Sequence, residues 1–471
     1  MVELTLDIFK KMLAAVGLVC LIGILAPSIF KIGESTFQSI VVLSFYVYCI
    51  VSLFTHSRHK LFFVLSLPVF TQFLHIFQKY AFTTGANSIW RLLPFIILDI
   101  YLVYFLLRYN QWNDKQNSLL TILWLTASVL FLAISPNLQN IIWGGIVIYI
   151  FTIPLLFSYL RIACQAHNFR QELEKYLCLM FIILGLGTFG LVYVGAGYKG
   201  SDNLLASRNI ADTNITMAYF ILLWPFALLY SVKNRVSVWF KTILMSIFMG
   251  VVILSFSRGA VFLVFPFILV TSLLATSFIN PRSVLAVALI GYLYRATITE
   301  FIKGQDLLYF WQLRFADMGS LNSLLTRLET ISGRTEIHKT AYSLFLHKPL
   351  LGSGIGSFEV LGPGFREAHS LWYTLLAEQG IIGTVFIYSI LAALLFKLII
   401  LASTRDRIYS ALLIAFICFV VFNHTIGSTF VILPGKSITV NCIAPLLLIC
   451  MHFYAENVDV QQLHLKSSAG V

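Results

Sequence analysis

Charged residues are scarce in this chain of 471 residues. Only 11% of its residues are Asp, Glu, Lys or Arg, whereas a soluble domain carries about 25%. Hydrophobic residues make up 59% of the chain, and such an excess of apolar surface must face lipid. The composition therefore excludes an ordinary cytosolic enzyme, a disordered protein and a nucleic-acid-binding module.

Motifs typical of soluble catalytic or metal-binding domains are also absent. The seven cysteines form no CxxC pair, so neither a metal knuckle nor a disulfide framework is predicted. The sequence contains no P-loop, no HExxH and no GxSxG motif, and it shows no internal repeat. The chemistry of this protein must therefore be sought in polar residues placed between apolar segments.

Long apolar segments occur along nearly the whole chain. A helix that crosses a membrane needs about 20 mainly apolar residues. The candidate spans are residues 12–30, 37–54, 61–78, 92–107, 119–134, 141–160, 176–195, 215–232, 238–256, 260–279, 283–298, 380–402, 408–426 and 436–453. Because several of them are short, we predict an all-α polytopic membrane protein with about 12–14 transmembrane helices.

Basic residues are distributed unevenly between alternate connecting segments. With the N-terminus in the cytoplasm, the inside loops hold most of them, and the short outside loops hold few. Cytoplasmic loops of membrane proteins are enriched in Lys and Arg, so we predict that both termini are cytoplasmic. We attribute the net charge of +12 to this topology rather than to nucleic-acid binding.

One long segment, residues 299–378, is polar and is predicted to lie on the outer side. Long connecting segments are usually functional. A helix is predicted from Arg334 to Lys348, where Pro349 stops it, and a second from Ala368 to Gln379, which Gly380 ends. The chain thus divides into N-terminal spans (1–298), the large outer loop (299–378), and C-terminal spans with a short cytoplasmic tail (379–471).

The outer loops contain arginines but no pair of neighbouring carboxylates. No DxD or ExD motif occurs there, so nothing suggests a divalent cation held against a diphosphate. Glu172 and Glu174 form an ExE pair on the cytoplasmic side, which we interpret as a solvated helix face. We therefore expect no metal and no cofactor, and we expect arginines to bind any phosphate on the outer side, because guanidinium groups bind phosphate oxygens bidentately.

Two arginines lie in short outer breaks between apolar segments. Arg258 precedes Gly259, which permits a tight turn, and Arg208 lies in a polar stretch before the span that begins near residue 215. A buried arginine in a membrane costs about 2.5–3.5 kcal/mol, which makes both positions candidate sites. The structural alternatives are snorkelling of Arg258 to lipid headgroups and simple capping and solvation around Arg208.

The two loop helices supply further candidates. Arg334, His338 and Tyr342 recur every four residues and are predicted to share one face of the first helix. His369 is predicted to begin the second helix, with Tyr373 on the same face. A helix N-terminus favours a neutral imidazole and a bound anion, so His369 is a candidate general base beside an anionic leaving group. The alternatives are an exposed amphipathic face and a structural histidine.

The sequence resembles the O-antigen ligase and polymerase family over roughly residues 200–400. The motifs that carry the resemblance are SRG (257–259), GR (333–334), HKPLLGSG (347–354), AHSLW (368–372) and LAEQG (376–380). Two positions depart from the family pattern: Ser370 stands where Asn often follows the loop histidine, and Arg208-Asn209 lacks the Pro-Asn often found nearby.

The resemblance implies a membrane-embedded, metal-independent glycosyltransferase with a GT-C-like fold, a multi-pass protein of the bacterial inner membrane whose active site is periplasmic. Its implied partners are an undecaprenyl-diphosphate-linked glycan donor, a lipid A-core acceptor and membrane lipids. A ligase transfers the glycan en bloc to lipid A-core, whereas a polymerase transfers it to another lipid-linked unit. A protein O-oligosaccharyltransferase, which uses the same donor, is a further alternative.

Together with the resemblance, the residue patterns assign His369, Arg258 and Arg334 to catalysis. Arg208, Arg258 and Arg334, with His338 and Tyr373, are expected to bind the diphosphate or the glycan. His369 would accept or orient the proton of the acceptor hydroxyl, and direct displacement would invert the anomeric centre. A lipid-linked sugar transporter is the alternative from another class; it would need ionisable residues in mid-membrane, for which Asp99 and His75 are the main candidates.

Overall fold

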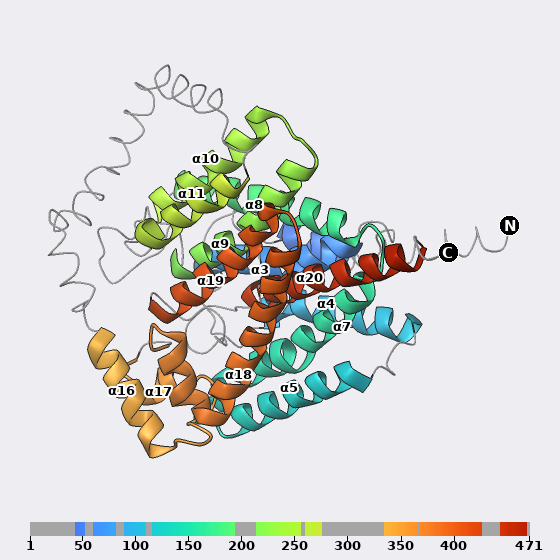
Figure 1. Ribbon diagram of the computed structural model, residues 1–471. Helices are drawn as coiled ribbons and strands as arrows, with labels where there is room; N and C mark the ends of the chain where they lie inside the picture. Colours follow the sequence, from blue (N-terminus) through green and yellow to red (C-terminus); the bar gives the residue numbers. More distant parts are fainter. Residues whose placement is uncertain are drawn as a thin grey trace, which may run out of the picture. The chain divides into compact units, whose positions relative to one another are not determined.

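The computed structural model describes residues 43–51, 60–81, 89–109, 115–193, 213–255, 260–275, 334–364, 367–425 and 443–468 (Figure 1). Within these ranges the chain is helical and contains no strand, which confirms the predicted all-α class. The chain forms two compact units. The first contains the described parts of residues 1–128 and 139–159, and the second those of 129–138, 160–432 and 443–471.

The helices of the N-terminal part follow the predicted spans closely. They are α3 (Lys60–Ala81), α4 (Ile89–Tyr109), α5 (Lys115–Ala133), α6 (Leu138–Gly144), the π-helix η2 (Gly145–Thr152) and α7 (Ile153–Ala163). In the first unit α4 packs against α3 and η2. The Thr152 hydroxyl, in the π-helical turn, donates to Asp99 at 3.1 Å. Asp99 is therefore a buried carboxyl with a neighbouring donor.

The second unit contains the remaining helices. They are α8 (Phe169–Tyr193), α9 (Thr213–Lys233), α10 (Val238–Leu254), the π-helix η3 (Ala260–Val264), α11 (Phe265–Leu274), α16 (Arg334–His347), α17 (Phe358–Leu361), α18 (Leu371–Thr404), the 3-10 helix η5 (Arg407–Tyr409), α19 (Ser410–Thr425) and α20 (Ile443–Ser468). The predicted spans 12–30 and 283–298 lie outside the described residues, so the number of spans stays a prediction. The side chain of His75 also lies outside the described residues.

Helix α9 forms the core of the second unit. Residues 216–229 are all buried, as expected for a helix that is apolar on every side and packs against α8, α19 and α20. Its Trp224 ring lies 5.2 Å from that of Phe248 on α10, and both rings contact Phe181 on α8. Such tilted and edge-on aromatic pairs add to the free energy gained by burial.

Four stretches of helix are long and apolar enough to cross a membrane: Leu138–Ala163, Thr216–Lys233, Leu371–Thr404 and Arg407–Thr425. Shorter apolar helices lie between them in the sequence. Large apolar side chains also point outward, including Leu107 and Phe396, each 65% exposed. Since a soluble protein rarely exposes so much apolar surface, this chain is an integral membrane protein.

Helix α18 is interrupted at Gly380. The residue has φ 60° and ψ −162°, a left-handed φ that glycine tolerates best. Trp372 and Tyr388 are separated by sixteen residues, yet their ring centroids are 5.7 Å apart. Sixteen residues of straight helix would rise about 24 Å, so α18 bends sharply at Gly380. The predicted stop at Gly380 is confirmed, but the helix begins at Leu371 rather than Ala368.

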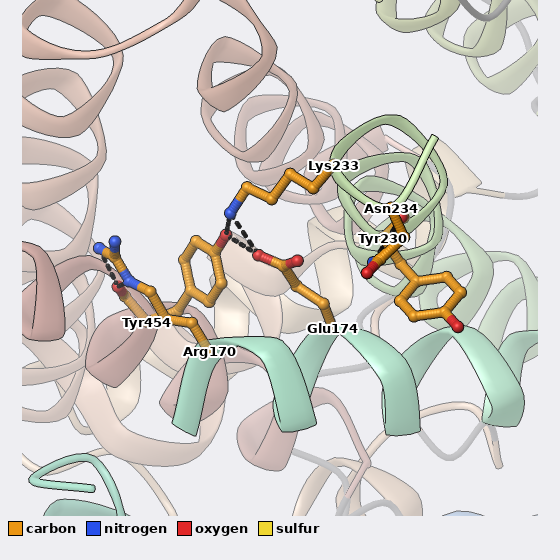
Figure 2. Close-up of polar contacts among 6 residues, drawn as sticks. All are labelled: Arg170, Glu174, Tyr230, Lys233, Asn234 and Tyr454. Atoms are coloured by element: carbon orange, nitrogen blue, oxygen red, sulfur yellow. Dashed lines mark hydrogen bonds and ion pairs between the residues drawn. The ribbon is translucent and has the colours of Figure 1, made fainter. Parts of the chain in front are cut away.

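A buried ion network joins three helices of the second unit (Figure 2). Glu174 of α8 is 1% exposed and lies 2.6 Å from the Lys233 ammonium of α9. The Tyr454 hydroxyl of α20 donates to the same carboxylate, and Arg170 donates twice to the Tyr454 carbonyl, at 3.1 and 3.0 Å. The interpretation of Glu174 as part of a solvated face was therefore wrong, because Lys233 and Tyr454 cover it.

Candidate active site in the polar loop

The segment after α16 docks onto the bend of α18. We call residues 349–354 the docking turn. The Ser353 and Gly354 amides donate to the carbonyls of Ala377 and Glu378, at 3.0 and 2.7 Å. In return, the amides of Ile381 and Ile382 donate to the docking turn. A broken helix leaves such backbone groups without partners, and the docking turn supplies them.

Two glycines allow this close approach. A Cβ atom at Gly352, whose φ is +64°, would lie 2.4 Å from the carbonyl carbon of Glu378. A Cβ atom at Gly380 would lie 2.5 Å from the carbonyl carbon of Leu350. Because backbone atoms cannot move aside as a flexible side chain can, both positions require glycine. The HKPLLGSG and LAEQG motifs thus form two halves of one contact.

The residues that follow the docking turn are held by hydrogen bonds as well. The Ile355 amide donates to the Phe131 carbonyl at 2.9 Å, and the Ser135 hydroxyl donates to the Ile355 carbonyl at 2.7 Å. The buried Glu378 carboxyl accepts a hydrogen bond from the Phe358 amide at 3.3 Å. These contacts fix the loop rigidly, which is what precise positioning of reactive side chains requires.

Helix α16 confirms the predicted first loop helix and packs beside the start of α18 (Figure 1). Ile337 and Ala341 face a small apolar core that includes Phe358, Ala368 and Ala377. The predicted common face of Arg334, His338 and Tyr342 is only partly correct. His338 stacks on Tyr373, whereas Tyr342 is exposed because the neighbouring row of Ile337 and Ala341 faces α18.

His338 and Tyr373 form a stacked pair, with ring centroids 4.3 Å apart and 16° between the planes. Burial lowers the pKa of His338 below its ordinary value of 6.5, and the positive charge of Arg334 lowers it further. His338 is therefore a neutral imidazole near pH 7. Within the described part of the chain its Nε2 atom is buried without a hydrogen-bond partner.

His369 lies just before α18 rather than in its first turn. Its φ is 53°, one of two positive values among the described non-glycine residues. Ser370 is the N-cap residue, and the Thr374 hydroxyl accepts the Ala368 amide at 3.1 Å, which holds the chain entering the helix. A left-handed conformation at a residue with a side chain is uncommon and is concentrated at functional sites.

Glu367 lies beside His369. Its Oε1 atom is 3.1 Å from Nδ1 of the imidazole, and the Glu367 side chain is 5% exposed against 29% for His369. The only local sign of this pair in the sequence is the spacing Glu-x-His, and the sequence analysis does not identify Glu367 as a site residue. We call Arg334, His338, Glu367, His369 and Tyr373 the loop cluster.

Arg334 ties the loop cluster to a second helix. Its Nη1 donates to the carbonyl of Thr425, the last residue of α19, at 2.6 Å. A cation at the C-terminus of a helix is favoured by the helix dipole. Next to Thr425, His424 donates from Nδ1 to the Val420 carbonyl at 2.8 Å, so its Nε2 accepts from the Tyr388 hydroxyl. Sequence spacing gave no sign of this second pair.

The structure thus brings together four predicted site residues, namely Arg334, His338, His369 and Tyr373. The other two, Arg208 and Arg258, lie outside the described residues.

Residues 242–388 match the sequence model of a family described as O-antigen ligase. No curated protein and no solved structure matches the chain. The matched range begins within α10 and ends within α18, beyond the bend at Gly380. It therefore contains Arg258 and the whole loop cluster, whereas Arg208 precedes it.

Proposed function

We propose, from the match of residues 242–388 to the O-antigen ligase family model, that this chain is a glycosyltransferase that transfers a glycan en bloc from undecaprenyl diphosphate to a hydroxyl of lipid A-core. The observation that carries the proposal is the loop cluster, which places a histidine, a carboxylate and a guanidinium around one rigid bend. We place the protein in the bacterial inner membrane with both termini cytoplasmic and the loop cluster periplasmic, because basic residues favour the opposite loops.

The reaction is a single displacement. The oxygen of the acceptor hydroxyl attacks the anomeric carbon, and its proton passes to His369. The bond between that carbon and the diphosphate oxygen breaks, and undecaprenyl diphosphate leaves with the electron pair. Attack from the face opposite the leaving group inverts the anomeric centre.

Arginines bind the leaving group in this proposal. Arg334, with Arg258 and Arg208, donates to the diphosphate oxygens, and hydrogen bonds to charged groups contribute about 1.5–3 kcal/mol each. Because negative charge grows on the diphosphate as the bond breaks, these donors stabilise the transition state more than the bound donor. No metal ion is required for this role.

The stacked pair of His338 and Tyr373 is suited to the glycan. A neutral imidazole can hydrogen-bond a sugar hydroxyl without repelling the neighbouring guanidinium. Trp372, 44% exposed at the start of α18, offers an aromatic face on which a sugar ring can stack.

One experiment tests the reaction and the acceptor together. The purified protein is mixed with a lipid-linked glycan and either lipid A-core or a second lipid-linked unit. Product on lipid A-core supports the ligase, whereas growth of the lipid-linked chain identifies a polymerase. If neither acceptor gives product and the same protein moves the lipid-linked glycan across a vesicle membrane, the protein is a transporter and not a glycosyltransferase.

A further inference from the structure

We infer that Glu367 is a positioning residue that holds His369 in the tautomer needed to accept the proton of the acceptor hydroxyl. The inference rests on the proposed function, since it assigns His369 a proton-accepting role. Glu367 itself touches neither substrate; it acts through His369.

The geometry places the carboxylate behind the imidazole. Glu367 Oε1 lies 3.1 Å from Nδ1 of His369, and Glu367 is the more deeply buried of the two side chains. The 3.1 Å contact is an ion-pair distance, and rotation of the ring would align Nδ1–H with the carboxylate; such catalytic hydrogen bonds often tighten only when substrate binds. His369 can therefore turn its other nitrogen, Nε2, toward the acceptor.

The chemistry of the carboxylate selects the tautomer. An ionised carboxylate only accepts hydrogen bonds, so it requires the proton of a neutral His369 to sit on Nδ1. Nε2 then carries the lone pair that accepts the hydroxyl proton. With Glu367 replaced by glutamine, the side-chain amide can donate to Nδ1 instead, which favours the opposite tautomer and leaves Nε2 protonated.

The charges around His369 require a negative partner. His338 on α16 interacts electrostatically with Arg334, Glu367 and His369 and stacks on Tyr373 of α18, while Glu367 contacts His369 from its own segment. When His369 takes up a proton, the imidazolium belongs to the same cluster as the Arg334 guanidinium, whose like charge opposes it. The Glu367 carboxylate offsets this repulsion, so its role is greatest at the moment of transfer.

The test compares Glu367→Gln with Glu359→Gln in the purified full-length protein. Glu359 is a carboxylate of the same loop that accepts from the Asn137 amide at 3.2 Å. For Glu367→Gln we expect kcat to fall about 10–100-fold while the donor Kd and the thermal midpoint stay near wild-type values. For Glu359→Gln we expect a wild-type kcat.

A double-mutant cycle separates positioning from structure. If Glu367 acts through His369, Glu367→Gln has no further effect once His369→Ala is present. A wild-type kcat in Glu367→Gln, an equal loss in both backgrounds, or a parallel loss of donor binding and thermal stability would overturn the inference. A His369→Ala variant as fast as wild type would instead contradict the proposed role of His369, whatever Glu367 does.

Discussion

The buried ion network and the loop cluster are both groups of charged side chains in an apolar chain, but they are built differently. In the network, the Glu174 carboxylate accepts from Lys233 and Tyr454, and Arg170 donates to the Tyr454 carbonyl. The carboxylate is almost completely buried. Such a group holds helices together.

The loop cluster is less completely paired than the network, and part of it is exposed. His369 keeps part of its imidazole exposed and has a left-handed backbone, and Nε2 of His338 is buried without a partner among the described residues. Polar groups left in this state cost stability and are retained where they bind or react. The comparison separates a network that stabilises the fold from a loop cluster that we propose serves the reaction.

The largest effect is expected from removing the reactive groups. His369→Ala and Arg258→Ala should each lower the rate of glycan transfer at least about 100-fold. The first variant loses the proton acceptor, and the second loses a guanidinium that donates hydrogen bonds to the diphosphate. Membrane insertion should be unchanged. Tyr342→Phe, an exposed position on α16, is the matched control and should retain wild-type activity. Full activity in either alanine variant would remove that residue from the mechanism.

Gly380→Ala should lower both the stability and the activity of the protein, because it disturbs the contact between the docking turn and the bend of α18. The added Cβ atom meets the backbone of Leu350 at 2.5 Å at a position with φ 60°, so the docking turn must move. We expect a loss of about 2–4 kcal/mol in the free energy of unfolding together with reduced transfer. Gly364→Ala shares a positive φ but meets no atom within 4 Å, and it should lose less stability.

Glu174→Ala should separate stability from activity. The change leaves the Lys233 ammonium and the Tyr454 hydroxyl without their buried acceptor, which should cost about 3 kcal/mol of unfolding free energy in detergent. The kcat of the folded fraction should stay at the wild-type value. Glu172→Ala, which removes a carboxylate that accepts from the exposed Asn168 side chain, is the control and should cost less than about 1 kcal/mol. Equal losses in both variants would contradict the distinction.

A smaller, pH-dependent effect is expected at His338. Its pKa is lowered in the folded protein, mainly by burial, so the unfolded chain binds more protons as the pH falls through about 6.5. The thermal midpoint should therefore decrease as the pH falls from 7.5 to 5.5. His338→Phe can stack on Tyr373 but cannot titrate, so its midpoint should fall less over the same range. An identical pH dependence in both proteins would exclude His338 as the cause.

Local sequence signals predicted the scaffold of the loop better than its chemistry. Pro349 and Gly380 end α16 and interrupt α18 as expected, because proline and left-handed glycine act within one helical turn. The start of α18 was placed three residues too early, since Thr374 binds the Ala368 amide and His369 adopts a left-handed conformation. Neither feature has a local sequence signature.

Contacts across the bend could not be predicted. The pairing of Tyr388 with His424, and that of Arg334 with the Thr425 carbonyl, join helices that are distant in the sequence. The contact between Trp372 and Tyr388 depends on the angle of α18 at Gly380, which a hydrophobic pattern does not encode. The burial of Glu174 likewise depends on Tyr454, far along the chain.

The central claim is that protein side chains alone, a histidine and arginines, drive glycan transfer. It is tested most directly by measuring transfer to lipid A-core by the purified protein in the presence of excess EDTA. The account predicts the same rate with and without the chelator, because no DxD or ExD motif occurs in the outer loops to hold a cation against the diphosphate. Loss of activity in EDTA that Mg²⁺ or Mn²⁺ restores would contradict it.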